Sequence, residues 1–157
     1  MRVAFRVDAS PEMGSGHLMR CLTLADELAG RGAAVQFLTR ASAGPLLDLV
    51  RAKGHVVVVL ADDDGGSGVR PMGLTPSNAD TDYAHWLPVS QLRDAEQTTS
   101  ALRGQTHGSD PLDWLIVDHY ALDHRWERAM RPHAKRLMVI DDLADRPHDC
   151  DLLLDQN

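Results

Sequence analysis

Hydrophobic and polar positions recur along this chain with two periods, one typical of strands and one typical of helices. Residues Val3 to Val7 alternate with a period of two, which predicts a strand. The polar, glycine-containing loop Asp8 to Gly16 follows. Apolar residues then recur at helical spacing, at Leu18, Leu22, Ala25, Leu28 and Ala29. Gly30 and Gly32 supply a stop signal, so the first part of the chain is predicted to be a strand, a loop and a helix.

The same order of elements recurs downstream. The sequence predicts further strands at 35–39, 56–60, 114–117 and 137–140, and further helices at 45–53, 89–102 and 123–131. Residues 56–60 are apolar throughout, which is typical of a parallel strand covered on both faces. Residues 61–82 are polar and rich in glycine and proline, and we assign them no regular structure. We therefore predict one Rossmann-like α/β domain over residues 1–157, an open and mainly parallel sheet with helices on both faces.

Polar residues follow the first, fourth and fifth predicted strands. They are the loop from Asp8 to His17, then Asp118-His119-Tyr120, then Asp141-Asp142. Right-handed crossovers bring the carboxyl ends of parallel strands to one edge, where open α/β sheets bind their ligands. We expect the functional site at this edge.

Composition narrows the classes of partner. The chain has 157 residues, 43% of them hydrophobic, which suffices for one core. Its formal net charge of -7 opposes binding to nucleic acid or to an anionic membrane, because no basic patch is segregated in the sequence. Cys21 and Cys150 have neither CxxC spacing nor the density of a secreted disulfide framework. With no signal peptide or membrane-spanning run, we expect a cytosolic protein with free thiols.

The loop Gly14-Ser15-Gly16-His17 lies between a predicted strand and a predicted helix. Small residues let the backbone approach a ligand there, and N–H groups of the first helical turn suit a phosphate. Met19 stands where the dinucleotide fingerprint has its third glycine, and no Gly-Lys-Ser/Thr follows, so neither common nucleotide motif is matched. His17 is either a general base, since an imidazole accepts protons near neutral pH, or a helix-start residue bonded to a local carbonyl.

The strand-end residues also allow two interpretations. Asp118, His119 and Tyr120 could recognise substrate hydroxyl or amide groups, or Asp118 could cap nearby N–H groups. Asp141 and Asp142 could hold Mg²⁺ or make structural hydrogen bonds, and the latter is favoured. The histidines show no spacing typical of a zinc site. Arg6 and Arg20 could each bind an anionic substrate or form ordinary ion pairs.

Five segments resemble the UDP-sugar hydrolases of pseudaminic acid biosynthesis, in the same order. They are Phe5-Arg6-Val7-Asp8-Ala9-Ser10, Met13 to Ala25 (MGSGHLMRCLTLA), Trp114 to Tyr120 (WLIVDHY), Ile140 to Arg146 (IDDLADR) and His148 to Asn157 (HDCDLLLDQN). These segments are distributed over nearly the whole chain.

The resemblance implies a substrate and a mechanism. That family hydrolyses UDP-2,4-diacetamido-2,4,6-trideoxy-β-L-altropyranose to the free sugar and UDP, without metal or other cofactor, on a two-domain fold similar to the GT-B glycosyltransferases. The histidine matching His17 is the proposed base for water attacking the anomeric carbon. Together with the loop and strand-end positions, the resemblance predicts the following substrate-binding residues: Gly14, Ser15, Gly16, Arg20, Asp8, Asp118, His119 and Tyr120.

In that family, a second Rossmann-like domain follows near the position of Asn157 and supplies most contacts to the nucleotide. We therefore expect a second domain or a second polypeptide to complete the site, and the present chain to hydrolyse the sugar nucleotide poorly by itself. Two other hypotheses stay open. The chain could be the N-terminal domain of a GT-B glycosyltransferase, with a sugar hydroxyl in place of water. It could also be a noncatalytic, receiver-like module with Asp8, Asp118 and Asp141 as its acidic site.

Overall fold

A computed structural model describes residues 1–62, 83–105 and 110–156, so the predicted loop at 61–82 lies almost entirely outside the described residues. Six strands form one sheet in the order β3-β2-β1-β4-β5-β6, with every neighbouring pair parallel. They are β1 (Arg2–Val7), β2 (Ala34–Arg40), β3 (Val56–Leu60), β4 (Trp114–Asp118), β5 (Leu137–Ile140) and β6 (Leu152–Leu154). The predicted α/β fold class is confirmed.

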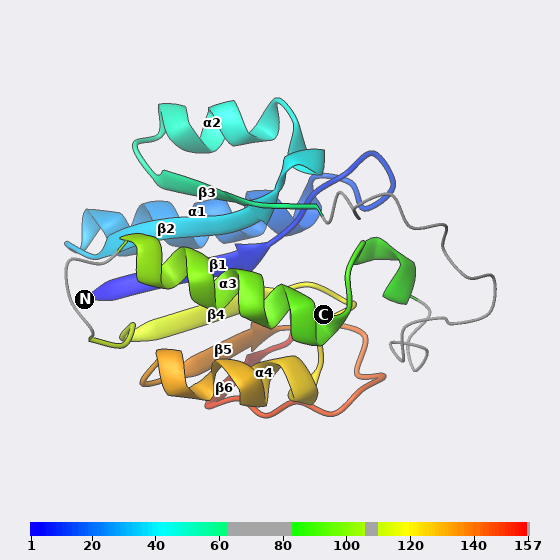
Figure 1. Cartoon of the computed structure of the whole chain (residues 1–157). Coiled ribbons are helices and arrows are strands. Elements are labelled where there is room, and N and C mark those ends of the chain that lie inside the picture. The colour runs from blue at the N-terminus through cyan, green and yellow to red at the C-terminus, as the bar shows by residue number, and fades with distance from the viewer. Residues whose placement is uncertain (63–82, 106–109, 157) are drawn as a thin grey trace.

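Helices cover the sheet from both sides. The α-helices are α1 (Gly16–Gly30), α2 (Leu46–Ala52), α3 (Gln91–Gln105) and α4 (His124–Met130). Short 3₁₀ turns are η1 (Ala41–Ala43), η2 (Ala84–Trp86) and η3 (Arg131–His133). Helices α1 and α2 pack on one face of the sheet, and α3 and α4 on the other (Figure 1). Within the described part of the chain, no helix has the length and apolar character needed to cross a bilayer.

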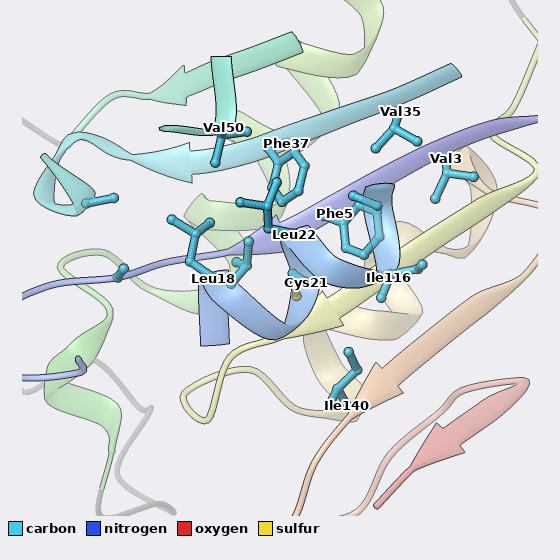
Figure 2. Close-up of a cluster of buried hydrophobic side chains, with 14 of the residues drawn as sticks. Val3, Phe5, Leu18, Cys21, Leu22, Val35, Phe37, Val50, Ile116 and Ile140 are labelled. Carbon is cyan, nitrogen blue, oxygen red and sulfur yellow. The ribbon is translucent and has the colours of Figure 1, made fainter. Parts of the chain in front are cut away.

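The core beneath α1 shows why the alternating pattern produces this packing. Successive side chains of a strand point to opposite faces, so Phe5 of β1 and Phe37 of β2 fall on the same side, paired in register. Their rings stack with centroids 5.0 Å apart, and Leu22 of α1 packs against them (Figure 2). Both rings are fully buried, so truncating Phe5 to alanine would cost about 3–5 kcal/mol of stability.

The same alternation decides which face each polar strand residue reaches. Ile116 belongs to the core beneath α1 and Val117 to the core beneath α3 and α4, so Asp118 returns to the α1 side. On β1, Phe5 and Val7 face α1, which turns Arg6 toward α3. The edge of the sheet therefore carries polar groups on two separate faces.

Two features depart from the expectations. Strand β6 was not predicted, because a run of three apolar residues is too short to show a period, and Leu152 and Leu153 are about half exposed. The order of the strands also differs from the receiver-like alternative. Receiver domains have the order 2-1-3-4-5, whereas here β1 separates β2 from β4 in the Rossmann order 3-2-1-4-5-6. The receiver-like hypothesis is therefore wrong at the level of topology.

Candidate functional site

The loop after β1 is a tight turn that places His17 at the start of a helix. The Gly14 N–H donates to the Ser10 carbonyl at 2.8 Å, and the Met13 N–H donates to Ser10 Oγ at 3.1 Å. Gly14 has φ +75°, a left-handed conformation that a side chain would strain. Helix α1 begins two residues later, and Ser15 makes no side-chain cap to its first turn. The first N–H groups of α1 are therefore left without a side-chain cap.

Three side chains of α1 converge on one carboxylate of β4. His17, Arg20 and Cys21 have i, i+3, i+4 spacing, which puts them on one face of the helix. Asp118 lies opposite them and is fully buried. His17 Nδ1 lies 2.6 Å from Asp118 Oδ1, and Cys21 Sγ lies 3.5 Å from Oδ2. Because a carboxylate only accepts hydrogen bonds, this contact assigns the imidazole proton to Nδ1 and leaves Nε2 as the acceptor.

Arg20 holds the same carboxylate from the side. Its Nε donates to Asp118 Oδ2 at 2.5 Å, and its Nη2 donates to Oδ1 at 2.6 Å. Burial by itself would raise the pKa of Asp118, but the hydrogen bonds from Arg20 and His17 outweigh burial and lower it below its ordinary value. Asp118 is therefore ionised at neutral pH and is shared between a guanidinium and an imidazole.

Aromatic rings form a wall beside His17. The Tyr120 ring meets the imidazole edge to face, with centroids 4.5 Å apart, and Trp86 of η2 stacks on Tyr120 at 5.6 Å. The Tyr120 hydroxyl donates to Asp142, and the Arg146 guanidinium lies 5.7 Å from the Tyr120 ring centre. Burial, with a smaller contribution from Asp142, raises the pKa of Tyr120 to about 12, so its hydroxyl stays protonated at neutral pH.

On the opposite face of the sheet, Asp8 belongs to a buried ionic network. Arg6 donates to both carboxylate oxygens of Asp8, at 2.7 and 2.8 Å, and the Arg40 N–H donates to Asp8 Oδ1 at 2.8 Å. Arg6 and Arg40 also both donate to Asp94 of α3, each at 2.6 Å. Burial would raise the pKa of Asp8, but the charge of Arg6 outweighs burial and holds it far below its ordinary range.

His119 is enclosed by the same network. Its Nδ1 accepts the Ala121 N–H at 3.1 Å, and its Nε2 lies 3.2 Å from Asp8 Oδ2. The residue is 1% exposed, as is Asp8. The structure therefore separates the predicted site residues into two groups. One group surrounds the glycine loop, and its members are Gly14, Ser15, Gly16, His17, Arg20, Asp118 and Tyr120. Direct contact of Asp8 and His119 with a substrate stays a prediction, and their polar atoms face the network beneath.

The carboxylate of Asp141, which follows β5, is bound by other groups of the protein. Asp141 Oδ1 lies 2.7 Å from Arg146 Nη2, and Asp141 Oδ2 accepts the Ala144 N–H at 3.1 Å. Burial would raise the pKa of Asp141, but the nearby imidazole of His148, 3.6 Å away, and the charge of Arg146 lower it to about 2. These contacts agree with the structural interpretation that the sequence favoured over a Mg²⁺ site.

The sequence did not single out two residues of this region, Asp94 and Trp86. Asp94 was only one polar position in a predicted helix, although it is fully buried and also accepts the indole N–H of Trp126 at 2.9 Å. A signal was present in the strands, because Arg6 and Arg40 interrupt otherwise apolar faces and require a buried counter-charge. Trp86 had no such signal, because its position depends on the fold around η2.

Comparisons with known proteins give a likeness in fold. No protein-family model and no curated protein matches the chain. Among solved structures, CalG4, the calicheamicin glycosyltransferase, is similar over 90% of this chain and 32% of its own, with a TM-score of 0.50 and 22% identity. The chain folds like one domain of a GT-B glycosyltransferase. LpCGTa, solved in complex with UDP, is similar over 89% of this chain and 30% of its own, with a TM-score of 0.47 and 18% identity.

The chain thus spans about a third of the length of these two proteins. Because the sequence identities are this low, the likeness shows the fold alone. The chemistry has to be argued from the residues of this chain. The edge that carries His17 is the edge where open α/β sheets bind ligands.

Proposed function

We propose that this chain is the base-bearing half of an enzyme that cleaves a sugar from UDP, with water as the attacking group. The observation that carries the proposal is the His17–Asp118 contact of 2.6 Å at the start of α1. Asp118 fixes the proton on Nδ1, and Nε2 makes no hydrogen bond to any of the described residues. A histidine oriented in this way by a carboxylate can accept a proton through its other nitrogen.

The proposed reaction uses these positions. A water molecule held at Nε2 of His17 attacks the anomeric carbon of the sugar while the imidazole accepts one of its protons. The bond from that carbon to the UDP oxygen breaks, and UDP leaves with the electron pair. N–H groups at the start of α1 and a second α/β domain stabilise the negative charge that develops on the diphosphate. Attack opposite the leaving group inverts the configuration at the carbon.

Water is favoured as the nucleophile by the enclosure of the base. The His17 side chain is only 8% exposed, and the rings of Tyr120 and Trp86 stand beside it. A small nucleophile suits this position better than a bulky acceptor. The sugar we propose is the one implied by the sequence resemblance, a diacetamido-trideoxy-altrose, and the Tyr120 wall offers an apolar surface for its methyl groups.

A second candidate function is glycosyl transfer, and the similarity in fold to a calicheamicin glycosyltransferase favours it. The two reactions would differ only in the nucleophile, since in glycosyl transfer His17 would deprotonate a hydroxyl of the acceptor in place of water. Transfer requires a pocket for the acceptor next to Nε2, whereas hydrolysis requires only a place for water. The product therefore distinguishes the two functions.

The deciding experiment uses a form of the enzyme that carries both α/β domains, supplied with the proposed UDP-sugar in ¹⁸O-labelled water. We expect the label in the released sugar. Label in UDP would mean attack on phosphorus and would overturn the mechanism, and turnover that depends on an added sugar acceptor would favour glycosyl transfer. His17→Ala is expected to lower turnover by about 10²-fold or more. His133→Asn, in η3 away from the glycine loop, is the control and should leave turnover unchanged.

A further inference from the structure

We propose that Arg146 is a positioning residue, which holds the ring of Tyr120 in place beside His17 and is not itself a ligand for the substrate. Arg146 lies in the connection between β5 and β6, and it is not among the residues that the sequence predicts to bind the substrate. The contacts that hold the ring belong to this chain alone. Their effect on turnover rests on the function proposed above.

Tyr120 and Arg146 meet because they follow neighbouring strands. Strands β4 and β5 pair in parallel, so the residues that follow them lie at the same edge of the sheet. The β5–β6 connection presents two groups to Tyr120 at this edge. The carboxylate of Asp142 accepts the hydroxyl of the ring, and the guanidinium of Arg146 lies over the ring, 5.7 Å from its centre. One segment therefore holds the ring both at its hydroxyl and at its face.

Every nitrogen of the Arg146 guanidinium has a partner within the protein. Nε donates to the Leu122 carbonyl at 2.9 Å, Nη1 donates to Asp145 Oδ1 at 2.8 Å, and Nη2 lies 2.7 Å from Asp141 Oδ1. The side chain is 3% exposed. A substrate anion would have to displace a buried carboxylate to reach this guanidinium, and that carboxylate would then lose its partner. Arg146 therefore acts on the site through its neighbours.

The same guanidinium also fixes the backbone that carries the ring. Leu122 follows Tyr120 closely in the link from β4 to α4, and it is 1% exposed. A buried carbonyl needs a donor, and Arg146 supplies it for Leu122. Because guanidinium is planar, it can bond this carbonyl through one edge and cover the ring with its face, whereas an ammonium group cannot do both.

The backbone of the β5–β6 connection is strained at Ala144. This residue has φ +52°, a left-handed conformation that is unfavourable for a residue with a side chain, and it is the non-glycine residue with positive φ among the described residues. Its N–H donates to Asp141 Oδ2 at 3.1 Å, and Arg146 approaches the other oxygen of the same carboxylate. Strain of this kind persists only where the surroundings fix it, and it is common at functional sites. The strained turn lies between Asp142 and Arg146, the two residues that hold Tyr120.

The ring held in this way bounds the space beside His17. The Tyr120 ring and the imidazole have centroids 4.5 Å apart and planes at 83°, and Trp86 stacks on the Tyr120 ring. In the reaction proposed above, water occupies the space next to the imidazole. A displaced Tyr120 ring would change where that water can lie, so loss of Arg146 should reduce turnover through Tyr120.

The test compares two arginines that bind the same connection. Arg146→Lys keeps a positive charge near Asp141 and loses the planar group that covers Tyr120. Arg131→Lys is the matched control, since Arg131 of η3 pairs with Asp149 of the same connection at 2.9 Å. Both variants are made in the present chain, without any substrate.

The readout is the set of NMR cross-peaks between the ring protons of Tyr120 and those of the His17 imidazole. The chain has two tyrosines, so a Tyr83→Phe variant assigns the signals of Tyr120. A thermal melt of each variant is recorded in parallel, which separates a loss of stability from a displaced ring.

In the unchanged chain, we expect clear cross-peaks between the two rings. Arg146→Lys should weaken or abolish them, because the ring is then held at its hydroxyl alone. Arg131→Lys should leave them as they are, even where it lowers the melting temperature. Cross-peaks that are unchanged in Arg146→Lys, or that weaken equally in both variants, would overturn the proposal.

A second measurement needs no change at Arg146. In the unchanged chain, the Nε proton of Arg146 should exchange slowly with water, since it is bonded to a buried carbonyl, and it should give a cross-peak to the ring protons of Tyr120. Absence of that cross-peak would contradict the proposal even if Arg146→Lys does not fold.

Turnover is measured separately, in the form that carries both α/β domains. Arg146→Lys should lower kcat by about 10-fold or more, since small displacements at a reacting centre have effects of this size, and Arg131→Lys should leave kcat unchanged. Loss of the ring cross-peaks with unchanged kcat would support the positioning of Tyr120 by Arg146 and contradict the place of water in the proposed reaction. The two proposals can therefore fail separately.

Discussion

His17 Nδ1 and Asp118 Oδ1 lie 2.6 Å apart although the residues are separated by 101 positions in the sequence. The contact holds the imidazole in one tautomer. Asp118→Asn replaces an acceptor by an amide that can donate to Nδ1, and this would move the ring proton to Nε2, where water must be deprotonated. We expect turnover of the two-domain enzyme to fall by about 10²- to 10⁴-fold, as for triad aspartates elsewhere.

Steady-state kinetics and a thermal melt check this prediction together. The protein should still fold, because asparagine has nearly the shape of aspartate, although Arg20 loses an ionised partner. Turnover within a few-fold of the unchanged enzyme would show that Asp118 does not orient the base.

The buried network around Asp94 should be a large contributor to stability. Asp94 accepts hydrogen bonds from Arg6, Arg40 and Trp126 and is fully buried. Asp94→Ala leaves two buried guanidinium groups without this partner, which typically costs about 3–5 kcal/mol. Urea unfolding followed by fluorescence measures the change in free energy. Asp48→Ala, at an exposed ion pair on α2, is the control and should barely shift the midpoint.

His148 should make the stability of the folded chain depend on pH on the alkaline side. Burial would lower the pKa of His148, but the nearby carboxylates of Asp141, 3.6 Å away, and Glu127, to which Nδ1 is hydrogen-bonded, outweigh burial and raise the pKa to about 9. The folded protein therefore binds this proton more tightly than the unfolded chain does. The resulting stabilisation is complete below about pH 6.5 and is lost as the pH rises through about 9.

Thermal melts between pH 6 and pH 10 test this linkage. The melting temperature of the unchanged chain should fall across that range by more than that of His148→Gln, which cannot bind a proton at this position. Parallel curves for the two proteins would contradict the assignment.

Cys21 should be unreactive in the folded chain. Burial, supported by the nearby Asp118 carboxylate, raises the pKa of its thiol well above the ordinary value, and the side chain is inaccessible. Because the thiolate is the reactive form, alkylation should require unfolding. In a Cys150→Ser background, we expect no labelling by iodoacetamide at pH 8 until urea is added. Rapid labelling of the folded chain would show that α1 opens readily at this point.

The sequence by itself determined the order of the elements and much of the site. Strand and helix periods are local properties, so the helix after the glycine loop could be predicted without knowledge of the partner residues. Parallel topology then predicted that His17, Asp118 and Tyr120 lie at one edge, and the structure places them in contact. Strand β6 escaped prediction because three residues are too few to carry a period.

Only the tertiary structure decided which polar groups form pairs. Asp8 and Asp118 have similar positions at strand ends, yet the strand alternation turns Asp8 toward Arg6 and Asp118 toward α1. Whether a charge is exposed to a ligand or neutralised within the protein depends on side chains many positions away, as Arg20 shows. Sequence spacing fixes the face that a residue occupies, whereas burial and the distances between opposite charges fix its chemical state.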